Sequence, residues 1–321
     1  MLQFLFFSVL TVNLLLLVLA LILDIFFGEP PPKIHPTVWI GRLITFLEQK
    51  LKVDGSPRNE KIRGIFLVFI LTIFCGLICH LTLYICYQIH FILFLIVGVF
   101  LLKSTFAIRS MRNHVIPIVE ALNKDDLIQA RKLVARIVSR NTSSLDKEHV
   151  ISATVESIAE NIVDGVTSPL FYFSLFGVLG AFIYRAINTL DSMVGYKNPY
   201  YLHFGWFSAT VDTLANFIPA RITGYLMILS SIFVRGDRKY AYKIFRYYRS
   251  KTESLNSGWL IAAMAGVLKV RLEKLGVYKI GENLRELSTE SIHQALHVMQ
   301  TTIFLFIILT VIPILALYIL V

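Results

Sequence analysis

The longest uncharged stretch of the chain, Gly64–Leu102, contains no Lys, Arg, Asp or Glu. An α-helix rises about 1.5 Å per residue, so about 20 apolar residues cross the hydrocarbon core of a bilayer. The stretch is therefore long enough for two membrane crossings. Three further uncharged stretches are Met1–Leu23, Gly165–Tyr184 and Ser291–Val321. A weaker apolar stretch, Thr213–Val234, is interrupted by Pro219 and Arg221.

The composition excludes a water-soluble globule. Hydrophobic residues make up 56% of the sequence and charged residues 16%, whereas soluble domains average roughly 25% charged residues. We expect an all-α, polytopic integral membrane protein with about four to six membrane segments, some of them re-entrant or interrupted. The predicted spans lie near residues 3–23, 65–84, 86–102, 167–187, 213–234 and 298–320 of a single membrane-embedded domain, residues 1–321.

The positive charge of the chain predicts its orientation. Lys and Arg number 31 against 21 Asp and Glu, a formal net charge of +10, and the basic residues gather in loops 24–63, 103–164 and 235–295. The positive-inside rule places these three loops in the cytoplasm and the N-terminus outside. The position of these loops next to membrane spans explains the surplus of Lys and Arg. We therefore do not interpret that surplus as a nucleic-acid binding surface, and we expect no nucleic-acid partner. Residues 1–23 have no Lys or Arg at their front end and no small-residue cleavage pattern after them. We therefore expect them to be retained as a membrane span and not cleaved as a signal peptide.

Three acidic residues form a column on one predicted helix. Glu156, Glu160 and Asp164 are spaced i, i+4, i+8, so their carboxylates repel one another on one face. One interpretation is a solvated helix surface. The other is a carboxylate cluster that binds Mg²⁺, which prefers carboxylates together with substrate phosphates.

Polar residues also interrupt the apolar stretches that follow. Arg185, Asn188 and Asp191 are spaced i, i+3, i+6 and share a helix face. Ionisable residues in apolar segments are costly, so they line a functional site or pair with one another, and both interpretations stay open. A second group of this kind comprises Asp212, Asn216 and Arg221.

Two loop segments carry weaker signals. His35 lies in the Gly28–Gly41 segment, which is either a Pro-rich exit loop with a surface histidine or part of a site. Asn256 and Ser257 lie in Ser254–Trp259, which is either a turn or a loop whose backbone N–H groups bind a phosphate.

Taken in their order along the chain, these segments resemble the adenosylcobinamide-phosphate synthase family of cobalamin biosynthesis. The resemblance extends from Asp24 to about Gly266 and is strongest from Arg185 to Arg221. Three positions depart from the family's pattern: Glu29 and Asn141 stand where Asp is expected, and Leu255 stands where Pro is expected.

The resemblance implies an amide ligation that uses ATP as co-substrate and Mg²⁺ as cofactor. A carboxylate of adenosylcobyric acid, a corrinoid, is joined to the amine of (R)-1-amino-2-propanol O-2-phosphate. The candidate catalytic residues are Asp191, His35 and Lys197, with His35 accepting the proton of the amine. The candidate substrate or phosphate ligands are Arg185, Asn188, Arg221, Asn216, Asn256 and Ser257. The candidate metal ligands are Glu156, Glu160 and Asp164, with Asp191 as a further ligand.

The resemblance also implies a multi-pass protein of the cell (inner) membrane whose site faces the cytoplasm, in contact with lipid. An association with other membrane enzymes of cobalamin assembly is a further expectation. Two other classes fit the same residues. Broken helices with internal charges are typical of a transporter for an anionic solute, and a non-catalytic membrane regulator on a related fold is the other alternative.

Overall fold

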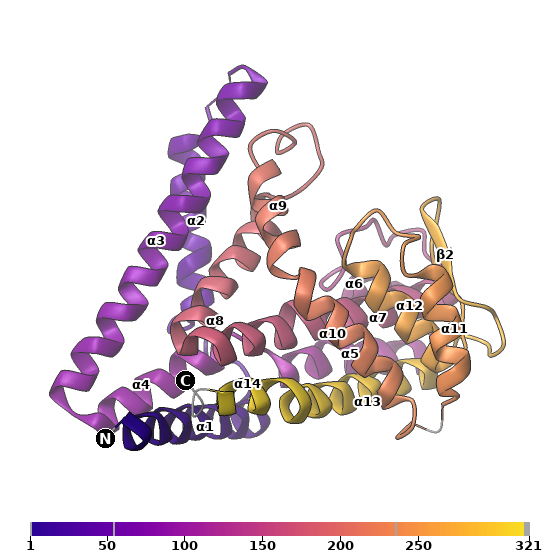
Figure 1. Cartoon of the computed structure of the whole chain (residues 1–321). Helices are drawn as coiled ribbons and strands as arrows, with labels where there is room; N and C mark the ends of the chain where they lie inside the picture. Colours follow the sequence, from indigo (N-terminus) through magenta and orange to yellow (C-terminus); the bar gives the residue numbers. More distant parts are fainter. Residues whose placement is uncertain (1, 54, 235, 318–321) are drawn as a thin grey trace. The chain divides into compact units, whose positions relative to one another are not determined.

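The computed structural model describes residues 2–53, 55–234 and 236–317 (Figure 1). Five helices in these ranges are long and apolar enough to cross a membrane, which agrees with the predicted all-helical class and its number of spans. They are Val9–Phe27, Pro57–Ile89, Phe91–Asn123, Lys147–Val194 and Thr289–Leu317.

The helices group into two compact units. Unit 1 comprises Met1–Ala107, Ser168–Ala215 and Thr310–Val321, and unit 2 comprises Ile108–Thr167 and Asn216–Leu309. The chain passes from one unit to the other several times, so each unit is built from segments that are distant in the sequence. The expectation of a single embedded domain, and of which loops face the cytoplasm, stays a prediction.

Unit 1 contains most of the uncharged sequence. Its helices are α1 (Leu2–Phe27), α2 (Pro36–Leu51), α3 (Pro57–Ile89), α4 (Phe91–Lys103), α8 (Ser168–Val194), α9 (Trp206–Ala215) and α14 (Ile312–Leu317). α4 packs on α1 and α3, and α8 packs on α2, α3 and α9. The break between α3 and α4 lies at His90, whose ring accepts a hydrogen bond from the Ile92 N–H and so caps α4. α4 also packs directly on α8.

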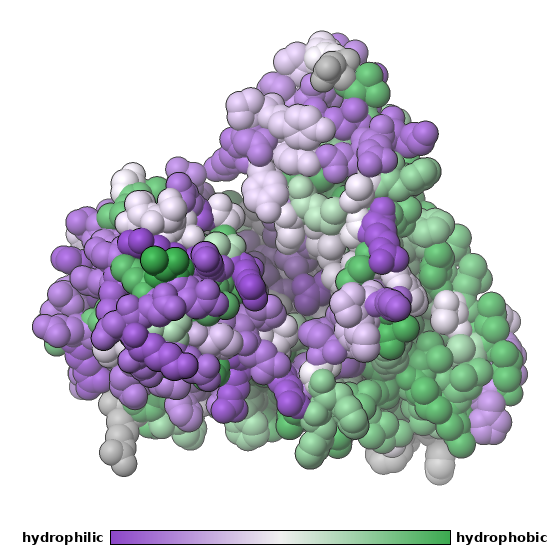
Figure 2. Space-filling view, turned by 180° about the vertical axis from the view of Figure 1, so that it is seen from behind, coloured by the Kyte–Doolittle hydropathy of each residue, from purple (hydrophilic) through white to green (hydrophobic). Residues whose placement is uncertain are grey.

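Large apolar side chains cover the outside of α3 and α4. Ile73 and Ile96 are more than 60% exposed, and most of the residues along the outer face of α3 are apolar. Figure 2 shows such hydrophobic residues gathered over a wide continuous area. Soluble monomers rarely expose apolar patches of this extent. The surface therefore suits contact with lipid.

Unit 2 carries more polar sequence around a buried helix. Its helices are α5 (Ile108–Asn123), α6 (Leu127–Val134), α7 (Lys147–Ile162), α10 (Phe217–Ser230), α11 (Arg238–Tyr248), α12 (Ser257–Leu268) and α13 (Thr289–Phe306). α12 is buried along nearly its whole length and contacts α7, α10, α11 and α13. Its many small residues allow this close packing. A short antiparallel hairpin of β1 (Leu272–Lys274) and β2 (Tyr278–Ile280) lies against α7 and α12 and is the one addition to the all-helical prediction among the described residues.

Several helices are interrupted, as the sequence suggested for some segments. Gly177 has a φ of 64° inside α8, a conformation that glycine adopts without steric cost, and it divides the helix. π-helical turns follow α7 at Val163–Thr167 and α13 at Ile307–Val311. The predicted span 213–234 contains the end of α9 and all of α10, of 10 and 14 residues, and it is not among the five long helices.

Candidate functional site

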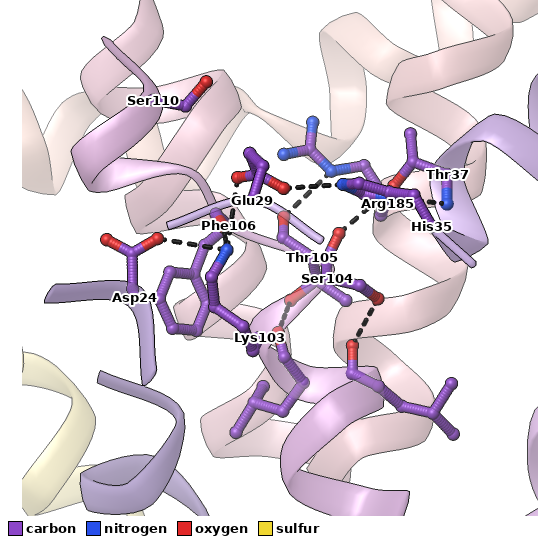
Figure 3. A network of polar contacts seen from close by, with 12 residues as sticks. Asp24, Glu29, His35, Thr37, Lys103, Ser104, Thr105, Phe106, Ser110 and Arg185 are labelled. Atoms are coloured by element: carbon purple, nitrogen blue, oxygen red, sulfur yellow. Dashed lines mark hydrogen bonds and ion pairs between the residues drawn. The ribbon is translucent and has the colours of Figure 1, made fainter. Parts of the chain in front are cut away.

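A buried lysine organises the end of the long apolar run in unit 1. The Lys103 Nζ lies 3.0 Å from the Asp24 Oδ1 and 3.2 Å from the Glu29 Oε1, and it donates to the Phe106 carbonyl at 3.2 Å. The three donors of the ammonium group are thereby satisfied. Asp24 and Lys103 are both at most 2% exposed. Figure 3 shows the lysine pointing between the two acids.

Glu29 links this ion pair to His35. The His35 Nε2 lies 2.6 Å from the Glu29 Oε2, while the Thr37 N–H donates to the His35 Nδ1 at 3.1 Å and caps α2. Because Nδ1 accepts, the ring proton is assigned to Nε2, which donates to Glu29. Both ring nitrogens are therefore engaged. A role for His35 as a base requires one of these hydrogen bonds to be given up.

The ionisation of Glu29 predicts a pH dependence of stability. Burial raises the pKa of Glu29, but the hydrogen bond from His35 and the charge of Lys103 outweigh it, so the pKa lies below its ordinary value of about 4.5. Folding thus lowers the pKa, and ionised Glu29 stabilises the fold above about pH 4.5. This contribution is lost as the pH falls through the lower pKa of the folded state. We expect Glu29→Gln to be less stable than the wild type at pH 7 and the difference to shrink below pH 4.5 in unfolding titrations; a difference independent of pH contradicts the prediction.

Three of the polar residues that interrupt the apolar stretches meet on α8 and α9. The Arg185 NH1 donates to the Asn188 Oδ1 at 3.0 Å, and the Asn188 Nδ2 donates to the Asp212 Oδ1 at 3.2 Å. The Arg185 Nε donates to the Thr105 carbonyl at 2.9 Å, which fixes the guanidinium against the end of α4. The predicted helix face of Arg185 and Asn188 is thus real, and Asp212 extends it to the next helix.

Asp191 lies one turn further along α8 and close enough to Asp212 for the two carboxylates to interact electrostatically. Its carboxylate lies against Gly195, where a Cβ atom would collide with the Asp191 Oδ1. Glycine at this position therefore leaves room for the carboxylate at the end of the helix. These two acids thus lie in the same polar region as the amide of Asn188.

The first acid of the column, Glu156 on α7, is held by several hydrogen-bond donors. Glu156 is 3% exposed, and it accepts hydrogen bonds from the Arg140 NH2 at 2.7 Å, the Ser152 hydroxyl at 2.7 Å and the Tyr278 hydroxyl at 2.6 Å. Glu160 interacts electrostatically with the charges of Glu156, Arg140 and Lys274. Three donors occupy three of the roughly four acceptor positions of the Glu156 carboxylate, so little of it is left for a metal ion.

The donor sets differ in how well they suit Mg²⁺. In the part of the chain that the structure describes, no group of three or more His, Cys, Asp or Glu side chains is placed to hold a metal ion. Mg²⁺ is usually bound by one or two carboxylates together with waters and substrate phosphates. Asp191 and Asp212 influence each other electrostatically, and we take them as the candidate carboxylates for such an ion. They fit this ion better than Glu156 does, and the metal roles of Glu160 and Asp164 stay predictions.

Tyr278 anchors the β-hairpin to α7 through Glu156. Burial raises the pKa of the Tyr278 hydroxyl, and the charge and hydrogen bond of Glu156 raise it further, so the hydroxyl stays protonated as a donor. We expect Tyr278→Phe to lower the free energy of unfolding by about 1–3 kcal/mol, because a buried charged acceptor loses one donor. Chemical denaturation in detergent measures this. Exposed Tyr247, changed to Phe, is the matched control, and equal stability of the two variants argues against the prediction.

Three of the predicted phosphate ligands of unit 2, Arg221, Asn256 and Ser257, come together. The Arg221 NH1 donates to the Asn256 Oδ1 at 2.6 Å, and its NH2 donates to the Leu255 carbonyl at 3.1 Å. The backbone N–H groups of Asn256 and Ser257 donate to the Ser254 hydroxyl, at 3.3 and 3.2 Å. The loop is thus a turn stabilised by serine, and the arginine, rather than the loop backbone, is its cationic feature.

Two predicted residues lie apart from these clusters. Lys197 is exposed in the loop between α8 and α9, and Asn216 is buried at the N-terminus of α10. Sequence analysis missed Lys103, Arg140 and Tyr278 as partners of acids. Lys103 offered a signal, since it is the charge that ends the longest uncharged stretch.

Comparisons with known proteins identify the family. The CobD/Cbib protein family matches residues 17–299. A probable cobalamin biosynthesis protein CobD from Methanocaldococcus jannaschii is 44% identical over 271 residues, 84% of this chain and 88% of that protein. Proteins of the same description from Methanococcus aeolicus and Thermococcus kodakarensis are 41% and 42% identical, over 92% and 87% of this chain and 95% and 88% of their own lengths. No solved structure matches. With a family match over most of its length and relatives above 40% identity, the chain belongs to the CobD/CbiB family of cobalamin biosynthesis proteins.

Proposed function

We propose that this protein is an adenosylcobinamide-phosphate synthase. It joins a carboxylate of adenosylcobyric acid to the amine of (R)-1-amino-2-propanol O-2-phosphate, with ATP as co-substrate and Mg²⁺ as cofactor. The observation that carries the proposal is the family match over residues 17–299, together with relatives described as probable cobalamin biosynthesis proteins. The buried charged clusters of the two units support it, because ionisable groups among apolar helices are costly and mark functional sites.

The proposed reaction proceeds by two displacements. A carboxylate oxygen of the corrinoid attacks the γ-phosphorus of ATP, the bond to the bridging oxygen breaks, and ADP leaves. The amine nitrogen of the second substrate then attacks the acyl carbon of the acyl phosphate. The nitrogen loses a proton, inorganic phosphate leaves, and the amide bond is complete.

The chain supplies candidate groups for each part of this chemistry. Asp191 and Asp212 would hold Mg²⁺, which when bound offsets negative charge on the phosphates of ATP. Arg185, fixed by the Thr105 carbonyl and Asn188, is oriented for paired contacts with a phosphate or carboxylate. The base that accepts the amine proton is His35 or Asp191.

The cellular setting is part of the proposal. ATP is supplied in the cytoplasm, so the site is expected at the cytoplasmic face of the cell membrane, where the basic loops are predicted to lie. The lipid-facing surface of unit 1 keeps the protein in the bilayer. Contacts with other membrane enzymes of cobalamin assembly stay an expectation.

A reconstituted assay tests the proposal. The full chain in nanodiscs is incubated with adenosylcobyric acid, the aminopropanol phosphate, ATP and Mg²⁺, and the product is identified by mass spectrometry. We expect one ADP and one phosphate for each amide formed, and no product when any substrate is omitted. Absence of product from folded protein with all substrates present overturns the proposal.

A transporter is the second candidate, because the break of α8 at Gly177 resembles the interrupted helices of transporters. Proteoliposomes separate the two functions. A transporter accumulates an anionic solute without forming an amide bond, whereas a synthase forms product without net solute movement.

A further inference from the structure

Two arginines of unit 2 share one indole ring. The guanidinium carbon of Arg221 lies 4.9 Å from the ring centroid of Trp259, and that of Arg249 lies 4.7 Å from it. Both are within the range of a cation–π interaction. The two like charges are also close enough to repel each other. A site that holds two cations close together despite their repulsion is suited to binding an anion.

The position of Arg221 is fixed by neutral groups. Its NH1 donates to the Phe217 carbonyl at 2.8 Å and to the Asn256 side chain at 2.6 Å, and its guanidinium lies 3.4 Å from the Phe217 ring centroid. These partners orient the guanidinium but carry no negative charge. The arginine is therefore placed before a ligand binds.

Arg249 is held in a similar way. It follows the last residue of α11 and lies 5.6 Å from the Phe245 ring centroid as well as over Trp259. None of the ion pairs found among the described residues includes Arg221 or Arg249. Both side chains are half-buried. Their charges are thus accessible and uncompensated.

We propose that Arg221 and Arg249, stacked on Trp259, bind the phosphate group of a phosphate monoester. A monoester carries a charge of about −1.5 to −2 at neutral pH, which two guanidinium groups balance. Their planar, forked donors also match phosphate oxygens in pairs. This assignment rests on the proposed function, in which the monoester is the phosphorylated amino alcohol.

The observations favour the monoester over ATP. Nucleotide triphosphates bind together with Mg²⁺, which one or two protein carboxylates usually help to hold. The contacts of the arginine pair are amide oxygens and aromatic rings, whereas paired carboxylates occur in unit 1 at Asp191 and Asp212. A reaction with two phosphorylated substrates requires a second anion site in addition to the one that binds ATP.

Binding of phosphate alone tests the site. Full-length protein in phosphatidylcholine nanodiscs is titrated calorimetrically with inorganic phosphate and with the aminopropanol phosphate. We expect Arg249→Gln to weaken both affinities by about 10- to 100-fold, as loss of a hydrogen bond between charged groups predicts. Lys243→Gln, an exposed basic position on α11, is the matched control and should bind normally. Arg249→Lys keeps the positive charge but lacks the forked donors of the guanidinium, so it should show an intermediate loss of affinity.

A lipid phosphate offers the same chemistry, because α11 is basic and amphipathic and suits a membrane surface. Nanodiscs that contain phosphatidic acid distinguish the sources. If phosphatidic acid binds through Arg249 and the soluble monoester does not, the substrate assignment is overturned. If the soluble monoester binds with equal affinity in both kinds of nanodisc, the assignment is supported.

The test separates this inference from the proposed function. In the synthase assay, Arg249→Gln should raise the KM for the aminopropanol phosphate and leave the KM for ATP unchanged. If wild-type protein forms no amide but its phosphate binding still depends on Arg249, the site stands and the synthase proposal fails. If the synthase is active and Arg249→Gln changes neither phosphate affinity nor this KM, the inference is wrong.

Discussion

Replacing Lys103 with Met is expected to destabilise the protein by about 3–5 kcal/mol, because it leaves buried carboxylates without their cation. Lys103 and Asp24 are almost completely buried, and Glu29 depends on the same ammonium group. Methionine keeps the length and apolar stem of lysine, so the change removes little packing. The expected loss is therefore mainly the cost of an uncompensated buried charge.

The three cysteines of α3 provide a measurement of this loss. Cys75, Cys79 and Cys86 are buried and free, so a thiol-reactive dye labels them as the protein unfolds in a denaturant titration. Asp24→Asn combined with Lys103→Met should recover part of the stability, because the remaining buried charge is smaller. Exposed Lys33, changed to Met, is the control. Equal midpoints for the two single lysine variants contradict the prediction.

The transmembrane helices were predictable because their signal is local. Some 20 residues without charge suffice to identify a span, and Gly64–Leu102 indeed forms most of α3 and most of α4. The boundary at His90 was not predictable, because it depends on a single side chain that caps α4 in an otherwise uniform apolar sequence. The division of the stretch 213–234 was hidden for a similar reason, since hydropathy does not reveal that Asn216 separates two short helices.

The candidate site was predictable only where its residues share one helix. Arg185 and Asn188 are three positions apart, so helical periodicity predicted that they share a face, and the structure shows a hydrogen bond between them. Pairs such as Lys103 with Asp24, or Tyr278 with Glu156, join residues that are far apart in the sequence. No helical period relates such residues. The acidic column on α7 therefore looked uncompensated, although remote donors neutralise Glu156.

Replacing Asp212 with Asn is expected to reduce the rate of amide formation by 100-fold or more with little effect on stability. Asparagine keeps the shape of the side chain and an oxygen that accepts from the Asn188 Nδ2, which lies 3.2 Å from the Asp212 Oδ1. It removes the negative charge that we assign to Mg²⁺ binding, a contribution worth several kcal/mol in metal-dependent catalysis, and about 1.4 kcal/mol changes a rate tenfold. The rate is measured in the reconstituted assay at saturating substrates.

Two controls define what the Asp212 variant means. Glu120→Gln removes an exposed carboxylate on α5 and should leave the rate unchanged. Asp191→Asn, which removes the other member of the pair, should raise the Mg²⁺ concentration needed for half-maximal rate, because one ligand of two is lost. Since phosphate binding at Arg249 involves neither acid, both variants should bind the aminopropanol phosphate normally. Full activity of the Asp212 variant at low Mg²⁺ would show that this pair does not bind the metal ion. The acids of the α7 column, Glu160 first, would then be the alternative Mg²⁺ ligands.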